Sequence, residues 1–444
     1  MVSFVLERIA LIIFVAACLF FGFVAGVVSN YVGLSSRDSI NSAVGLVVDL
    51  GRHWRSELGL EPTRFLKKAR HDGSGVTRLV PEHSFAGLTL VSGLFDDEVA
   101  LRLIDLDGTV VNQWPVPFDR LMRDIDYVAP ASDRPTHKWG IFVHGAVMLP
   151  DGSVVFNVSH IKLVKLGRCG QVEWIVPRMT HHSVFPTVDG AFWVPSKLYH
   201  NPPPESFRSL ASWVHEDTLL KVASDGTILQ EISVMEILER NGLFGLLGAN
   251  GRPSPTRGGG FGWRDPVHLN DLDVLGAPLS LDIPGVNPGD IMISARNLDL
   301  VLIFDPATLE VRWWQKGPWV RQHDPEVMRD GRIAVFNNNR DKLLAGGSTI
   351  LAIDPVTRRV NTLYPLDTSH EFYTDCCGKL ELLENDNLLI TIQEEGRIIE
   401  VTPSGEIVWQ FINRYDEDRI AYVYDGIRYP RSYFQEDAFS CPKP

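Results

Sequence analysis

The sequence predicts an all-β fold, a six-bladed β-propeller preceded by an N-terminal transmembrane helix and a short helical linker. Hairpin-like segments recur along the chain, each with a strand, a tight turn containing Asp, Gly or Pro, and a second strand. Most of them follow another strand–turn–strand pair, so that each unit holds about four strands. Six such units start near residues 86, 139, 180, 265, 321 and 372. A pair of β-sandwiches would explain the turns but not this sixfold recurrence.

The N-terminal residues 1–36 are predicted to form an uncleaved transmembrane anchor. Residues 9–28 are an uncharged apolar run of 20 residues, which is long enough to cross a bilayer as a helix. A cleaved signal peptide usually has a shorter apolar stretch and a small-residue cleavage site. A lipoprotein-type cleavage before Cys18 is the alternative.

The remaining boundaries follow from where the repeat begins and ends. Residues 37–80 contain an amphipathic stretch and are predicted to be a helical linker, residues 81–435 the propeller, and residues 436–444 a C-terminal tail. Residues 235–264 interrupt the repeat with a predicted short helix and a loop rich in Gly and Pro. Because insertions of this length are often functional, we expect a lid there.

Charge and cysteine content narrow the function. The formal net charge is -13 and there is no run of Lys and Arg, so nucleic acid is not an expected partner. The five cysteines include no C-x-x-C pair, which argues against a zinc or redox motif of that kind. The adjacent Cys376 and Cys377 are either two free thiols or a strained vicinal disulfide.

Several histidines share one position of the repeat. His144, His182 and His323 each precede a turn and an apolar strand, and His268 is close to the same position. The first strand of every propeller blade lines the central channel, so these side chains should converge at one mouth of it. They could instead cap strands or link blades. Imidazoles can act as base, nucleophile or metal ligand, and the nearby Arg296 suits an oxyanion.

Four short motifs resemble the arylsulfotransferase family of bacterial six-bladed propellers. They are "HLN" at residues 268–270, "SAR" at residues 294–296, "QHD" at residues 322–324 and "FNN" at residues 336–338. The order and context of these motifs, rather than any one of them, carry the resemblance, which covers roughly residues 80–435.

The resemblance implies transfer of a sulfuryl group from a phenolic sulfate ester to another phenol, through a sulfohistidine and without a nucleotide donor. On this resemblance, His323 is the nucleophile, and His268 and Arg296 hold the sulfate oxygens. His182 or His181 assists transfer of the proton of the phenol. The candidate substrate-binding residues are Asn270, His181, His144 and Asn337, of which His144 has no assigned step in the reaction. The implied partners are small aryl sulfates and phenols, with no cofactor and no metal. The resemblance also places the propeller on the periplasmic side of a bacterial inner membrane.

The chain departs from the family pattern in places, and other functions stay open. A loop at residues 276–289 separates His268 from Arg296, and we expect no separate N-terminal β-domain of the kind found in well-known members, because residues 37–80 are short and not strand-like. One alternative is a non-catalytic propeller that binds a ligand or partner at its channel face. Another is a metal-dependent lyase or hydrolase that uses the histidine ring, although the cationic Arg296 would weaken metal binding.

Overall fold

A computed structural model describes residues 20–24, 51, 53–56, 58–205, 213–247, 264–276, 283–342 and 344–441. The chain divides into two compact units, Met1–Trp54 with Arg252–Trp263, and Arg55–Gly251 with Arg264–Pro444. No helix among the described residues is long and apolar enough to span a membrane. Most of the predicted anchor lies outside the described residues, so the anchor remains a prediction without structural support.

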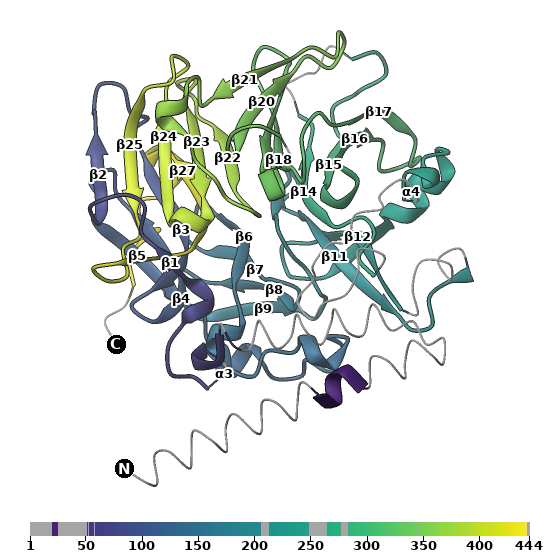
Figure 1. Cartoon of the computed structure of the whole chain (residues 1–444), viewed down its shortest axis with the longest axis horizontal. Helices are drawn as coiled ribbons and strands as arrows, with labels where there is room; N and C mark the ends of the chain where they lie inside the picture. The colour runs from purple at the N-terminus through teal and green to yellow at the C-terminus, as the bar shows by residue number, and fades with distance from the viewer. Residues whose placement is uncertain are drawn as a thin grey trace. The chain divides into compact units, whose positions relative to one another are not determined.

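The second unit holds six antiparallel sheets of four or five strands, set around a common centre (Figure 1). This confirms the all-β six-bladed propeller. In order from the innermost strand outward, the first three sheets are β27 (Val423–Tyr429), β3 (Leu88–Phe95), β4 (Glu98–Ile104) and β5 (Val110–Pro115); β6 (Val143–Met148), β7 (Val154–Val158), β8 (Lys162–Leu166) and β9 (Val172–Val176); and β10 (Phe185–Pro186), β11 (Phe192–His200), β12 (Val214–Val222) and β13 (Ile228–Ser233).

The other three sheets follow the same plan. They are β14 (Leu269–Val274), β15 (Ile291–Ala295), β16 (Leu300–Phe304) and β17 (Val311–Lys316); β18 (His323–Val327), β19 (Ile333–Asn337), β20 (Thr349–Ile353) and β21 (Val360–Tyr364); and β22 (Lys379–Leu382), β23 (Leu388–Ile392), β24 (Arg397–Val401), β25 (Ile407–Ile412) and β2 (Gly75–Leu79). A short ladder joins β1 (Leu66–Lys68) to β26 (Arg419–Ala421).

Helices are few and short in the described part of the chain. Among the described residues from 58 to 441, the α-helices are α3 (Phe118–Leu121) and α4 (Val234–Arg240), and the 3-10 turns are η1 (Thr63–Phe65), η2 (Ala131–Asp133), η3 (Lys138–Gly140), η5 (Phe244–Leu247), η6 (Arg296–Leu298), η7 (Arg340–Lys342), η8 (Thr368–His370), η9 (Gln393–Glu395) and η10 (Arg431–Tyr433). The helix α4 starts where Ser233 caps it by accepting a hydrogen bond from the Glu236 amide, at 3.1 Å. It matches the helix expected near residue 235, whereas the expected lid loop lies largely outside the described residues.

Blade packing explains why the middle strands are apolar on both faces. Every residue of β7, β16 and β19 is buried, because a neighbouring blade covers each face of the sheet. The outermost strands, such as β21, mix exposed and buried positions because one edge meets water.

Tryptophans on the outer strands join neighbouring blades in a repeated way. In four blades the indole N–H donates to a backbone carbonyl in the turn between the third and fourth strands of the next blade. These pairs are Trp114 to Gly167 at 3.2 Å, Trp174 to Ser224 at 2.9 Å, Trp313 to Pro355 at 2.9 Å and Trp409 to Leu106 at 2.8 Å. The sequence pattern of hairpins that end on Trp therefore reflects blade-to-blade contacts.

The ring closes through strands from both sides of the repeat. The innermost strand of the first blade is β27, which pairs with β3, and β2 adds a fifth strand to the last blade by pairing with β25. The first predicted unit thus holds only three strands of its blade. Within the predicted helical linker of residues 37–80, residues 51 and 53–56 are helical, whereas β1 and β2 are strands because they pair with sheet edges.

The cysteines resolve into a bridge and a free pair. Cys169 and Cys441 form a disulfide that joins the turn after β8 to the C-terminal segment. Cys376 and Cys377 are free thiols, with their sulfur atoms 3.1 Å apart. Of the two alternatives weighed for this vicinal pair, the structure shows the thiols.

Candidate functional site

The candidate site lies where the inner strands begin. His144 and His323 lie at the starts of β6 and β18, His268 immediately precedes β14, and His182 precedes β10. All four side chains are buried. The structure therefore brings together the histidines that share one position in the sequence repeat.

His182 is the centre of this cluster. Its ring centroid lies 4.5 Å from that of His144, 5.0 Å from His181, 5.2 Å from His268, 5.9 Å from His160 and 6.2 Å from His323. Burial lowers the pKa of His182 well below its ordinary range, and the neighbouring imidazoles lower it further. Neutral imidazoles, able to accept protons, therefore fill this mouth of the channel.

Backbone geometry fixes the central ring. His182 has a φ of +61° and His268 a φ of +52°, a left-handed conformation that non-glycine residues rarely adopt. Gly145 lies so close to this segment that a Cβ atom there would be 2.1 Å from the carbonyl oxygen of His182. Only glycine permits that approach, so "HG" at residues 144–145 has a steric reason.

His160 belongs to the cluster although the sequence reasoning missed it. It lies in the turn between β7 and β8, with its ring centroid 4.9 Å from that of His181. The overlooked signal is a second repeated position, just after the second strand of each blade. Arg296 follows β15 and Asn338 follows β19 in the same way, and these positions meet the starts of the inner strands.

Two hydrogen bonds fix the tautomer of His323. Its Nδ1 lies 2.6 Å from Oδ1 of Asn338, while the backbone N–H of Cys377 donates to Nε2 at 3.2 Å. The amide nitrogen of Asn338 donates to the carbonyls of Thr374 and Cys377, which leaves Oδ1 as the acceptor. Nδ1 therefore carries the proton and Nε2 carries the lone pair.

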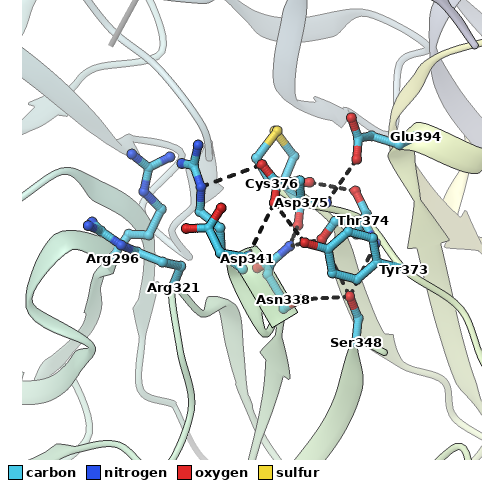
Figure 2. A network of polar contacts seen from close by, with 12 residues as sticks. Arg296, Arg321, Asn338, Asp341, Ser348, Tyr373, Thr374, Asp375, Cys376 and Glu394 are labelled. Carbon is cyan, nitrogen blue, oxygen red and sulfur yellow. Dashed lines mark hydrogen bonds and ion pairs between the residues drawn. The ribbon is translucent and has the colours of Figure 1, made fainter. Parts of the chain in front are cut away.

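A polar network holds the segment that contacts His323 (Figure 2). Ser348 Oγ donates to the Asn338 carbonyl at 2.9 Å and accepts from the Thr374 amide at 3.2 Å. Glu394 accepts from the Asp375 amide at 2.8 Å. These contacts hold Asn338 and the Cys377 amide in position against the imidazole of His323.

Arginine side chains supply positive charge beside the histidines. Arg296 and Arg321 both donate to Oδ1 of Asn297, and Figure 2 shows them on the same side of the polar network. Burial lowers the pKa of His323 well below its usual range, and the charge of Arg296 lowers it further. Two guanidinium groups held together beside neutral imidazoles favour an anion.

His268 is oriented by a buried acid. Its Nδ1 contacts Asp265 Oδ2, and Asp265 Oδ1 accepts from Lys197 at 3.0 Å. Burial raises the pKa of Asp265, but Lys197 and His268 outweigh it and hold that pKa well below its usual range. The carboxylate therefore stays charged and directs the other ring nitrogen of His268 away from itself.

The remaining predicted residues occupy different surroundings. Asn270 donates to the Gln322 carbonyl at 2.7 Å, and its own oxygen has no partner in the described part of the chain. His144 Nε2 is likewise buried without a partner. Asn337 instead accepts from the Val320 amide at 2.9 Å and donates to Thr349 at 3.0 Å. The neighbouring Asn338 thus contacts His323, whereas the amide of Asn337 is used within the fold.

The described residues contain no group of three or more His, Cys, Asp or Glu side chains placed to hold a metal ion. What the arrangement offers is a neutral imidazole with an oriented lone pair, further imidazoles that can take a proton, and two arginines. Those groups suit group transfer from an anionic donor.

Comparison with known proteins assigns the chain to a family. A family model described as arylsulfotransferase (ASST) matches residues 145–414, more than half of the chain. No curated protein matches this chain.

The chain also resembles solved structures, at low sequence identity. A protein of unknown function from Bacteroides caccae is 12% identical, with 73% of this chain and 94% of that chain covered and a TM-score of 0.46. Virginiamycin B lyase from Staphylococcus aureus is 11% identical, with 79% and 88% covered and a TM-score of 0.40. Nothing about function follows from likenesses of this size.

Proposed function

Because this chain belongs to the arylsulfotransferase family, we propose that it transfers a sulfuryl group from a phenolic sulfate ester to a phenolic acceptor through a sulfohistidine at His323. The observation that carries the proposal is the orientation of this imidazole. Its Nδ1 proton is held by Asn338, its Nε2 faces the backbone N–H of Cys377, and the charge of Arg296 helps to keep its pKa well below the usual range. A buried neutral imidazole of this kind is a nucleophile without prior deprotonation.

In the first half-reaction, Nε2 of His323 leaves its hydrogen bond with the Cys377 amide, and its lone pair attacks the sulfur of the aryl sulfate. The N–S bond forms as the S–O bond to the aryl oxygen breaks, and the electron pair leaves with the phenolate. Arg296 and His268 hold the sulfuryl oxygens, where charge is concentrated as the bonds exchange. Arg321, which shares the Asn297 oxygen with Arg296, adds positive charge to the same place.

In the second half-reaction, the acceptor phenol loses its proton and its oxygen attacks the same sulfur. The N–S bond breaks and its electron pair returns to Nε2. His182 takes the phenol proton, because its lowered pKa keeps it neutral and it lies at the centre of the cluster. His181 lies beside His182, with the two Nδ1 atoms 2.8 Å apart, so that the two imidazoles form a hydrogen-bonded pair.

The proposal is tested by mass spectrometry of the full chain after incubation with 4-nitrophenyl sulfate. We expect a gain of about 80 Da, one SO3, on the peptide that contains His323, and its loss when a phenol is added. A folded protein that gains no such mass from several aryl sulfates would favour the alternative, a non-catalytic propeller that binds a ligand at its channel face.

We also propose that the propeller lies outside the cytoplasm, held at the cell membrane by residues 1–36. The uncharged run at residues 9–28 supports an anchor. The Cys169–Cys441 disulfide fits an oxidising compartment. Protease added to intact spheroplasts should then digest the propeller, and complete protection would contradict this placement.

Asn338 should matter through the position of His323. We expect Asn338→Ala to lower kcat on the order of 10²-fold with little change in KM, because the nucleophile loses the acceptor that fixes its ring. Initial rates with 4-nitrophenyl sulfate measure both constants. The matched control is Asn361→Ala on β21, whose amide oxygen accepts from Arg332 at the surface. Equal rates in the two variants would contradict this role.

A further inference from the structure

The inner strands continue past the histidine cluster and line a separate cavity. All six of them contribute to its wall, which encloses about 260 Å³. Apolar parts of that wall come from Phe185, Leu275 and Val327. None of the residues assigned to sulfuryl transfer lines it, so the cavity needs an explanation of its own.

The wall of this cavity is strongly acidic. Its carboxyl side chains are Asp271, Asp273, Asp324, Glu326, Glu381 and Asp425. Among the described residues of the wall, the only cationic side chain is that of Lys379, which lies 3.1 Å from Asp271 and also pairs with Asp324. One ammonium group thus faces six carboxyl groups.

Three of these carboxyl groups accept backbone hydrogen bonds that hold the inner strands together. Asp425 Oδ2 accepts from the amides of Gly145 and Ala146 at 2.8 and 3.1 Å. Asp324 Oδ2 accepts from the Leu380 amide at 2.5 Å, and Glu381 accepts from the Arg428 amide at 2.8 Å. Each contact joins the inner strands of neighbouring blades, or of the two blades that close the ring.

Two buried carboxyl oxygens of this wall have no hydrogen-bond partner among the described residues. Asp271 and Asp425 are 2% and 1% exposed, and Oδ2 of the first and Oδ1 of the second make no hydrogen bond with any residue that the structure describes. The half-buried Asp273 and Glu326 line the same cavity, and no hydrogen bond or ion pair joins either side chain to the described part of the chain. Buried acceptors without partners are costly, which points to a ligand that supplies donors.

Electrostatics supports a positively charged ligand. Burial raises the pKa of Asp273 and of Glu326 well above their usual range, and neighbouring carboxylates raise both further. Without a ligand, these groups avoid mutual repulsion by holding protons. A cation in the cavity would replace those protons.

We propose that this cavity binds a small organic cation that carries a primary ammonium group. Three N–H donors can reach carboxyl oxygens on different strands, whereas the described residues offer no group of three ligands placed for a metal ion. The volume exceeds that of a single ion, and Phe185, Leu275 and Val327 can contact an apolar body. The ligand is therefore an amine with a hydrophobic part.

The test is calorimetric titration of the full chain with phenethylamine, beside its neutral analogue 2-phenylethanol. We expect the amine to bind and the alcohol not to. The variant Asp273→Asn, Glu326→Gln should bind the amine about tenfold or more weakly, because two of the unpartnered carboxylates are gone. The amides have nearly the shape of the protonated acids that they replace, so we expect the variant to stay folded.

The controls separate this site from the site of sulfuryl transfer. Asp225→Asn with Glu406→Gln makes the same changes at exposed positions and should leave amine binding unchanged, as should His323→Asn. Equal binding of the alcohol, or full amine affinity in the Asp273 and Glu326 variant, would overturn the proposal. Binding of magnesium chloride alone, with no response to the amine, would overturn it in favour of a metal site.

Discussion

Replacement of His323 by Asn is expected to lower sulfuryl transfer from 4-nitrophenyl sulfate by about 10⁴-fold or more. The amide has a similar shape and can still contact Asn338 and the Cys377 amide, but it has no nitrogen lone pair that can attack sulfur. Release of 4-nitrophenolate measures the rate, and intact-protein mass spectrometry measures the adduct. Both signals should disappear together while the thermal unfolding temperature changes little.

The matched control is His370→Asn, a histidine of the exposed turn η8, which should keep full activity. The wild-type rate should also hold as the pH falls from about 7.5 to 6.5, because burial and Arg296 keep the pKa of His323 well below the ordinary 6.5. Protonation of an ordinary histidine would halve the nucleophile there. An adduct that persists in His323→Asn would place the nucleophile on another side chain, with His182 the first to replace.

Replacement of Arg428 by Met is expected to lower the free energy of unfolding by about 3–5 kcal/mol. Arg428 lies on β27 and pairs with Glu400 on β24, and both side chains are 0% exposed. Arg428 also donates to Thr89 at 3.0 Å. The variant would leave the Glu400 carboxylate buried without its cation, at the point where the propeller closes. Urea unfolding followed by tryptophan fluorescence measures the change.

Two further variants separate the lost charge partner from lost packing. Arg428→Met with Glu400→Leu removes both charges and should recover much of the stability. Arg78→Met breaks the exposed pair with Glu406, whose side chains are about half exposed, and should cost less than about 1 kcal/mol. If Arg428→Met were as mild as Arg78→Met, the buried pair would not stabilise the closure.

The repeat and the histidine ring could be predicted because both are local patterns. His144, His182 and His323 precede similar turns, and a propeller converts one position of the repeat into one place in space. The pairing of β27 with β3 could not be predicted, because residues far apart in sequence set its register. His160 was missed since it follows a second strand rather than preceding a first one.

The choice between Asn337 and Asn338 shows a different limit of prediction from the sequence. Successive side chains of a strand point to opposite faces, so an error of one residue exchanges the two. Asn337, the last residue of β19, turns toward Val320 and Thr349, and Asn338 turns toward His323. Motif similarity located the pair, and only the hydrogen bonds separated their roles.

The closing strand also bears on how the chain is made in the cell. Translation produces β3 early, and all eight of its residues are buried in the finished ring, yet β27 emerges from the ribosome last among the blade strands. Throughout synthesis of the intervening blades, β3 presents an apolar edge that another chain could extend. A nascent chain stalled before residue 423 would therefore be a substrate for chaperones or proteases rather than a smaller working enzyme.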